Sequence, residues 1–254
     1  MLKNRVIPIL LLKDGKLVKT VNFENPQYVG DPINVIHIFN KKEVDELIII
    51  DISASKNKIE PNFNLIKDIA SECFMPLTYG GGIKSINHVE KILSMGVEKV
   101  SIQSAAIENP EFITHLSKLF GSQSVIVSLD IKKNWLGKPK CYYASKNSIL
   151  KKNLHIFIKE LVDLGAGELL INNVDKDGTL SGPDLKLIKQ ITDLVKVPII
   201  SCGGISSLDD IKSIVDAGAN AVGVGSFFIY YGPHRAVLIT YPSYHQLETL
   251  FHNK

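Results

Sequence analysis

The sequence is poor in the residues that build crosslinked or metal-bound folds. Three cysteines occur in 254 residues, and Cys73, Cys141 and Cys202 are far apart and outside any CxxC pair. An odd number of dispersed cysteines argues against a disulfide framework or a zinc site. We therefore interpret them as packing residues, and no motif elsewhere indicates a metal or a cofactor.

Long hydrophobic runs, low-complexity tracts and a strong charge of either sign are also absent. The apolar stretch near the start is too short to span a bilayer and lacks a small-residue cleavage site, so we expect a cytoplasmic protein without a signal peptide or membrane contact. The net charge is +3, and the lysines are scattered along the chain. This distribution disfavours nucleic acid as a partner and suits a small anionic ligand.

The chain does contain a regular alternation of short β-rich runs and longer amphipathic segments. The predicted strands are 6–12, 46–51, 75–81, 99–103, 125–130, 168–172, 197–204 and 221–225. The predicted helices include 61–73, 86–95, 110–119, 155–164, 184–195 and 208–217, several opened by Ser85, Pro110, Pro183 or Ser207. Eight such units in about 250 residues favour an α/β fold, a (β/α)8 TIM barrel forming one domain over 1–254, rather than an open doubly wound sheet.

An internal repeat supports this interpretation. The segment that begins at Pro76 aligns without a gap on the segment that begins at Pro198, an offset of 198 − 76 = 122. Both carry Gly-Gly-Ile, a serine at the helix start, a glycine before the next strand and a serine at the end of that strand. The sequence therefore predicts a duplicated half-barrel with pseudo-twofold symmetry.

The repeat predicts two phosphate sites, because glycines after a strand let backbone N–H groups approach an oxyanion near a helix N-terminus. The first cradle would consist of Gly81, Gly82, Gln103 and Ser104. The second would consist of Gly203, Gly204, Gly225 and Ser226, helped by Asp177, Gly178 and Thr179. A single Gly-Gly pair is also typical of a tight turn, but two copies favour a ligand that carries phosphates at both ends or along its length.

Carboxylates at strand ends are the candidate acid–base groups. The first and fifth predicted strands align at an offset of 130 − 11 = 119, which sets Leu11 opposite Asp130. Two such positions can present an acid and a base to one ligand, but here Asp130 alone can titrate. Asp51 ends the second strand in a similar place and is a candidate ligand contact, although a rim carboxylate can also cap a loop.

Long motifs follow one another along the chain, among them KDGKLVKTVNFEN, DELIIIDISAS, FGSQSVIVSLD and DKDGTLSGPD. In this order they resemble the cyclase subunit of imidazole glycerol phosphate synthase. The resemblance implies a (β/α)8 barrel that forms a heterodimer with a glutaminase and takes ammonia from it. It also implies a lyase reaction, in which a bis-phosphorylated ribonucleotide is cleaved and cyclised to imidazole glycerol phosphate and an aminoimidazole carboxamide ribotide.

The resemblance implies two catalytic aspartates, at positions 11 and 130, and this chain has Leu11 at the first. Leucine cannot transfer a proton, so we expect cyclase turnover to fall by roughly the 10²–10⁴-fold that general acid–base groups supply. Other residues match the family, namely Lys19, Phe23, Gly82, Ser104, Asp177, Gly178 and Thr179. Gln103 stands where the family has asparagine, and Asn172-Asn173 where it has Thr-Ser.

Two further stretches, ILLLKDGKLVKTVNF and YYGPHRAVLITYPS, resemble a paralogous branch associated with sugar amidination in surface-glycan synthesis. That likeness implies that the barrel and its glutaminase feed ammonia to a separate sugar amidotransferase, which converts an acetamido sugar to an acetamidino sugar. The loss of one rim acid fits a chain that has left ring formation behind.

Charges at four strand starts form the last candidate site. Four charged residues lie at or near the beginnings of the first, second, fourth and sixth predicted strands, where a packed core rarely holds charge: Arg5, Glu46, Lys99 and Glu168. They match the ring of alternating charges that lies at the mouth of the family's ammonia passage. A structural floor whose charges satisfy one another is the alternative, because the bottom face of such barrels usually serves stability.

Two other functions stay open. One is a working cyclase of histidine biosynthesis that uses Asp130 together with water or another group. The other is an unpartnered barrel isomerase of phosphorylated sugars, suggested by the Gly-Gly-Ile repeat, which related isomerases share.

Overall fold

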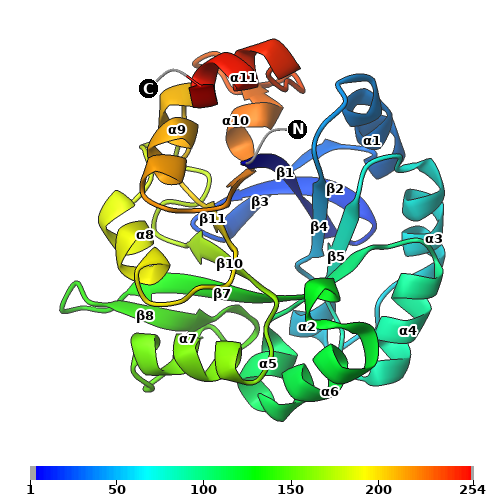
Figure 1. The fold of residues 1–254 in the computed structure, drawn as a ribbon. Helices are drawn as coiled ribbons and strands as arrows, with labels where there is room; N and C mark the ends of the chain where they lie inside the picture. Colours follow the sequence, from blue (N-terminus) through cyan, green and yellow to red (C-terminus); the bar gives the residue numbers. More distant parts are fainter. Residues whose placement is uncertain (1–3, 253–254) are drawn as a thin grey trace.

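Eight parallel strands close into a barrel in the computed structural model, which describes residues 4–252 (Figure 1). The barrel strands are, in order, β1 (Arg5–Lys13), β4 (Leu47–Asp51), β5 (Leu77–Gly80), β6 (Lys99–Ile102), β7 (Val125–Lys133), β10 (Glu168–Asn173), β11 (Ile199–Cys202) and β12 (Ala221–Val224). The last strand, β12, pairs in parallel with β1 and closes the circle. This confirms the predicted (β/α)8 fold, and β1 and β7 lie on opposite sides of the barrel.

Helices surround the barrel, as Figure 1 shows. Those expected from the sequence are α3 (Phe63–Glu72), α4 (Ile86–Ser94), α6 (Glu111–Phe120), α7 (Leu154–Asp163), α8 (Leu185–Thr192) and α9 (Leu208–Asp216). The sequence interpretation did not name α1 (Pro32–Lys41), the C-terminal α11 (Tyr244–His252) or the short helices α2 (Ala54–Asn57), α5 (Ser104–Glu108) and α10 (Ser226–Ile229). Within residues 4–252, no helix has the length and apolar character to cross a membrane.

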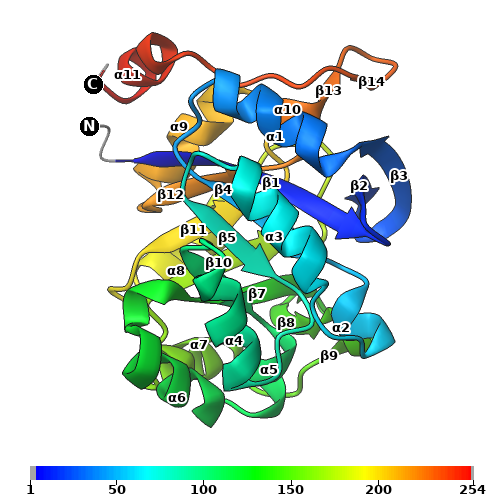
Figure 2. The same cartoon turned by 90° about the vertical axis from the view of Figure 1, so that its right-hand side faces the viewer.

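Three β-hairpins rise from the end of the barrel at which its strands finish, on the right-hand side of Figure 2. The first pairs β2 (Lys16–Val21) with β3 (Glu24–Gly30), and the second adds β8 (Pro139–Tyr143) and β9 (Ser148–Ile149) to the extended end of β7. The third pairs β13 (Tyr230–Tyr231) with β14 (Ala236–Val237). The first two of these hairpins contribute residues to the wall of the C-terminal mouth.

The internal repeat is visible in the element boundaries. Adding 122 to the bounds of β5, α4 and β6 gives the bounds of β11, α9 and β12, as in 77 + 122 = 199 and 86 + 122 = 208. The helix caps repeat too, because the Ser85 hydroxyl accepts from the N–H three residues on, at 3.2 Å, and Ser207 does the same at 3.1 Å. Two similar sequence segments therefore build quarter-barrels with matching element bounds on two sides of the axis.

An apolar layer fills the middle of the barrel. Its buried members are Ile7, Ile9, Ile48, Ile126, Leu170, Ile200 and Ala221, against which Leu11, Ile50 and Cys202 pack. A larger cluster lies between the strands and the helices. The central layer separates the charged strand starts at one end from the polar strand ends at the other, and so divides the barrel into two functional faces.

Candidate functional site

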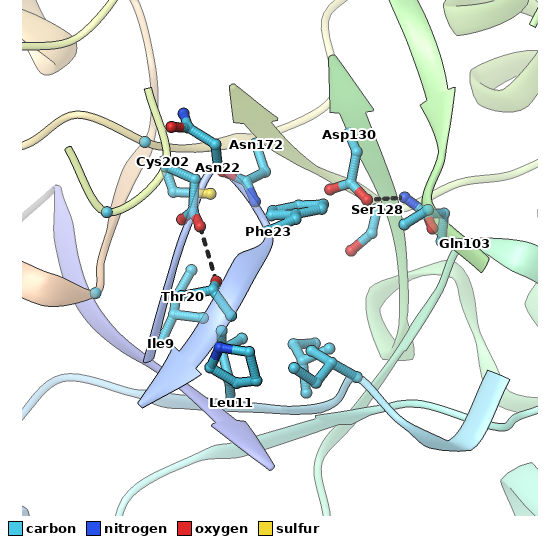
Figure 3. A pocket seen from close by; sticks show the side chains of 18 of the residues that line it. Ile9, Leu11, Thr20, Asn22, Phe23, Gln103, Ser128, Asp130, Asn172 and Cys202 are labelled. Atoms are coloured by element: carbon cyan, nitrogen blue, oxygen red, sulfur yellow. Dashed lines mark hydrogen bonds between the residues drawn. The ribbon is translucent and has the colours of Figure 1, made fainter. Parts of the chain in front are cut away.

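A pocket of about 880 Å³ opens at the C-terminal ends of the barrel strands. In Figure 3, Asp130, Gln103 and Ser128 gather on one side of it, and Ile9, Leu11 and Thr20 on the other. Since side chains alternate along a strand, residues 128, 130 and 132 of β7 share the face that lines this pocket. This is the face at which barrel enzymes place their chemistry.

Asp130 is a half-buried carboxyl group that lines the pocket. Its Oδ2 accepts a hydrogen bond from Gln103 Nε2 at 2.5 Å. Burial raises the pKa of Asp130 to about 7, against the opposing effect of the Gln103 hydrogen bond, and the charge of Asp177 raises it further. A carboxyl group that titrates near neutral pH can take up or release a proton during a reaction.

Leu11 faces the same pocket from β1, on the opposite side of the barrel. It pairs in register with Ile50 of β4 and Val18 of β2, and it packs against the central apolar layer. Leu11 thus adds an apolar, half-buried side chain to this part of the pocket wall. The two aligned positions, 11 and 130, differ in surroundings as well as in side chain.

Lys19 is a buried cation beside the second cradle. Its Nζ donates to the Ile9 carbonyl at 2.5 Å, and a Cβ added to Gly225 would come within 2.8 Å of that nitrogen. Burial lowers the pKa of Lys19 to about 8, partly offset by the charge of Asp177. The glycine at 225 thus leaves room for a cation that can face an anionic ligand.

Asp177 is hydrogen-bonded to Thr20 and lies in the electrostatic field of Lys19. Thr20 Oγ1 donates to its Oδ2 at 3.2 Å, and burial raises the pKa of Asp177 while Lys19 acts against that rise. Gly178 follows with φ +70°, and a Cβ there would strike the Thr20 carbonyl at 2.1 Å. The DKDG turn is therefore locked against the β2–β3 hairpin and lines the pocket with a fixed backbone.

The first predicted cradle is partly assembled. Gly81, Gln103 and Ser104 line the pocket, whereas the Gly82 N–H is turned to Ser55 Oγ at 3.2 Å. Gly81 has φ +120°, where a Cβ would come within 2.5 Å of the Asp51 carbonyl. Gly82 is not among the lining residues and so belongs to the supporting layer of this cradle.

Asp51 lines the pocket, and its carboxylate also has a local structural role. Its Oδ1 accepts hydrogen bonds from Ser53 N at 2.9 Å, Ser53 Oγ at 2.6 Å and Ala54 N at 3.1 Å, at the start of α2. Asp51 thus lies at the rim of the pocket, where it can contact a ligand, and it also caps a loop. The sequence offered these two roles as alternatives.

The second cradle brings most of its predicted residues to the pocket. Gly178, Gly203, Gly204, Gly225 and Ser226 all line it. Thr179 does not, because its hydroxyl donates to the Lys176 carbonyl at 2.8 Å within the loop. The two cradles lie on opposite sides of the mouth, as the repeat requires.

The four charged residues at the strand starts form a closed alternating ring. Arg5 Nη1 lies 2.6 Å from Glu46 Oε1, and Arg5 Nη2 is also paired with Glu168. Lys99 Nζ lies 3.6 Å from Glu46 Oε2 and 3.3 Å from Glu168 Oε2. Each charge therefore has two neighbours of opposite sign, and Glu168 is the most buried of the four. The ring closes the end of the barrel away from the pocket.

Several pocket residues were not predicted as site residues. Tyr142 of β8 faces Asp130 across the β7–β8 pair, and its ring centroid lies 6.3 Å from that of Phe23. Asn172 contributes a buried Oδ1 without a hydrogen-bond partner among residues 4–252. The two-residue alternation of VIVSLDIKK carries a signal for Ser128 and Lys132, whereas the register that brings Tyr142 to Asp130 depends on a hairpin absent from the expected elements.

Comparison with known proteins gives consistent matches. The family model described as "Histidine biosynthesis protein" matches residues 5–235. The chain is 47% identical to "Putative imidazole glycerol phosphate synthase subunit HisF" of Leptospira borgpetersenii, over 99% of this chain and 100% of that protein. It is 47% identical to "Putative imidazole glycerol phosphate synthase subunit hisF2" of Pseudomonas aeruginosa, over 98% of this chain and 99% of that protein. It is 39% identical to "Imidazole glycerol phosphate synthase subunit HisF" of Petrotoga mobilis, over 91% and 92%.

Proposed function

The chain belongs to the histidine biosynthesis protein family, among relatives of imidazole glycerol phosphate synthase HisF subunits, and from this membership we propose that it is the barrel subunit of a glutamine amidotransferase complex. In the proposal residues 1–254 act as one domain, a glutaminase subunit docks at the strand starts, and its ammonia reaches the pocket, in which a phosphorylated ligand binds. The observation that carries the proposal is the complete ring of Arg5, Glu46, Lys99 and Glu168 at the end of the barrel opposite that pocket.

The barrel interior supports the passage of ammonia. Neutral ammonia can cross the apolar layer between the ring and the pocket, whereas ammonium would pay a large desolvation cost there. Carboxylates of the ring can attract ammonium, and the proton must be left behind before the apolar layer is crossed. In this proposal the charged ring attracts ammonium, and the apolar layer lets neutral ammonia pass while it excludes ammonium.

The pocket supports a ligand with two phosphates. The glycine and serine rims stand on opposite sides of the mouth, and the Lys19 cation lies beside the second of them. Asp130, with a pKa near 7, serves as the proton-transferring group at the ligand. Lys19, Asp51 and Asp177 serve as ligand contacts in this proposal.

We further propose a specialised role outside histidine synthesis. Leu11 stands where the family's second catalytic aspartate belongs, and the apolar surroundings of Leu11 support a position that no longer handles protons. The complex then serves the amidination of an acetamido sugar and hands its ammonia to a sugar amidotransferase. A working cyclase of histidine biosynthesis is the second candidate, favoured by the near-neutral pKa of Asp130.

The Leu11→Asp variant separates these two functions. The chain is supplied with an ammonium salt and the histidine-pathway ribonucleotide, and formation of the imidazole product is followed. We expect little turnover by the unaltered chain and a modest rise in turnover on Leu11→Asp, because the new carboxylate can act as a general acid or base. The rise should be modest because Gln103 still alters the position of the substrate. Leu11→Asn is the matched control, since it adds polarity without an acid and should give no rise.

The opposite result would favour the second candidate. Vigorous turnover by the unaltered chain, abolished by Asp130→Asn, contradicts the specialised role and identifies a working cyclase.

A further inference from the structure

The hairpin that extends β7 and β8 over the pocket carries an unbalanced charge. Residues 131–153 include seven lysines and no aspartate or glutamate. Three of the lysines are paired with carboxylates of other elements, as Lys133–Asp184, Lys146–Glu108 and Lys152–Glu160. The remaining four, Lys132, Lys138, Lys140 and Lys151, have no carboxylate within ion-pair distance among residues 4–252.

Two of these four lysines face each other directly. Lys132 of β7 is opposite Lys140 of β8 in the antiparallel register, and both side chains are half-buried. Directly opposed side chains have Cβ atoms about 5 Å apart, at which like charges destabilise the pair of strands. Glu24 also lines the pocket but pairs with neither lysine in the described part of the chain. The fold therefore holds two cations together with no carboxylate in ion-pair contact with either of them among residues 4–252.

Lys132 lines the pocket, and Lys140, its cross-strand neighbour, lies on the same face of the hairpin just outside the lining residues. The neighbouring cross-strand pair, Asp130 and Tyr142, lines the pocket, and Lys132 lines it as well. The Lys132 Nζ sits 5.2 Å from the centroid of the Tyr142 ring, which orients this ammonium group. Two residues of strand separate Lys132 from Asp130, a rise of about 7 Å.

We propose that Lys132 and Lys140 form an anion subsite that holds a further phosphoryl group of the ligand in the pocket, outside both glycine cradles. Two ammonium groups match the charge of about −1.5 to −2 on a phosphoryl group, whereas a carboxylate would neutralise one of them. The inference deepens the proposed function and rests on it, because it assigns to the phosphorylated ligand of the pocket a phosphoryl group roughly 7 Å along the hairpin from Asp130. Binding of this group relieves the repulsion between the opposed lysines.

Site-resolved acetylation tests the subsite on the intact chain. Lysine acetylation rates are measured by peptide mass spectrometry in inorganic phosphate and, at equal ionic strength, in acetate. We expect phosphate to slow modification of both Lys132 and Lys140 by about twofold when its concentration equals the dissociation constant. Acetate should leave both rates unchanged. Lys138, exposed on the same hairpin, is the internal control and should respond to neither anion.

A charge reversal provides the matched variants. Lys140→Glu places a carboxylate opposite Lys132, so it should raise the melting temperature and remove the phosphate effect at Lys132. Lys138→Glu makes the same change of charge at the exposed control position and should retain that effect. The deciding measurement is whether phosphate still slows the acetylation of Lys132 in each of the two variants.

Equal slowing at Lys132, Lys140 and Lys138, or a phosphate effect at Lys132 that survives Lys140→Glu, would overturn the subsite. The readout requires neither glutaminase nor ammonia. Failure of the amidotransferase proposal is therefore seen in a different measurement from failure of the lysine pair.

Discussion

Asp130 and Leu11 occupy aligned places on opposite strands, yet their surroundings differ in how they treat a charge. Asp130 has an amide donor in Gln103 and a neighbouring carboxyl group in Asp177, whereas Leu11 contacts aliphatic side chains. The first environment allows both protonation states near neutral pH. The second would favour the neutral form of any carboxyl group placed there, so one side of the pocket retains acid–base capacity and the other provides an apolar wall.

The raised pKa of Asp130 makes a prediction about stability. The folded state holds this proton up to a pH of about 7, while an unfolded aspartate loses it near pH ~3.9. The stabilisation that this bound proton gives the folded state is therefore fully present below the unfolded pKa. It is lost as the pH rises through the folded pKa of about 7. We expect Asp130→Asn to be more stable than the unaltered chain at pH 8, by roughly 2 kcal/mol, with the difference much reduced at pH 5.

Denaturant unfolding of both chains at the two pH values measures this difference. A gap between the two chains that is the same at pH 5 and pH 8 would show that the Asp130 carboxyl group does not change its protonation on unfolding over that range.

At the scale of elements, the repeated quarter-barrels depend on serine caps. The Ser85 hydroxyl accepts the His88 N–H at 3.2 Å at the start of α4. We expect Ser85→Ala to lower the free energy of unfolding by about 1 kcal/mol, because a helix N–H loses its partner. Ser94→Ala in the same helix is the control and should change stability by no more than ~0.5 kcal/mol, since Ser94 is exposed and its hydroxyl bonds only to the Lys91 carbonyl. Equal losses in the two variants, measured by denaturant unfolding, would contradict the capping role.

The strands and most helices could be predicted because their signals are local. The run ELIIID predicts a strand, and the capping residue Ser207 predicts a helix start, each within a few residues. The helix α1 was missed although Asp31 and Pro32 are typical of a helix start, so a usable signal was present there. The β2–β3 and β8–β9 hairpins have weaker local signals, because their pairing with the ends of β1 and β7 depends on tertiary register.

The candidate site was predicted in composition more fully than in geometry. Glycine pairs after strands identify both cradles, but the sequence does not show that Ser55 takes the Gly82 N–H or that Thr179 turns back into its own loop. Likewise, the charges of Arg5 and Glu168 can be read at strand starts, whereas their pairing requires strands to meet across a closed barrel. Contacts between distant segments are what sequence patterns leave undetermined.

At the scale of the whole molecule, the barrel has two chemically different ends. One carries the alternating ring of Arg5, Glu46, Lys99 and Glu168, and the other carries the pocket and its three hairpins. The proposed function requires ammonia to enter at the first end and to reach the ligand pocket at the second. A glutaminase must therefore dock on the face of the strand starts and leave the hairpins free.

Hydrogen–deuterium exchange of the chain with and without the glutaminase of the same organism tests this arrangement most directly. We predict slower exchange in the complex at the segments that begin β1, β4, β6 and β10, with exchange of the β7–β8 hairpin unchanged. Protection confined to the hairpins, or no protection at the strand starts when the glutaminase is in excess, would contradict the account of an ammonia-receiving barrel.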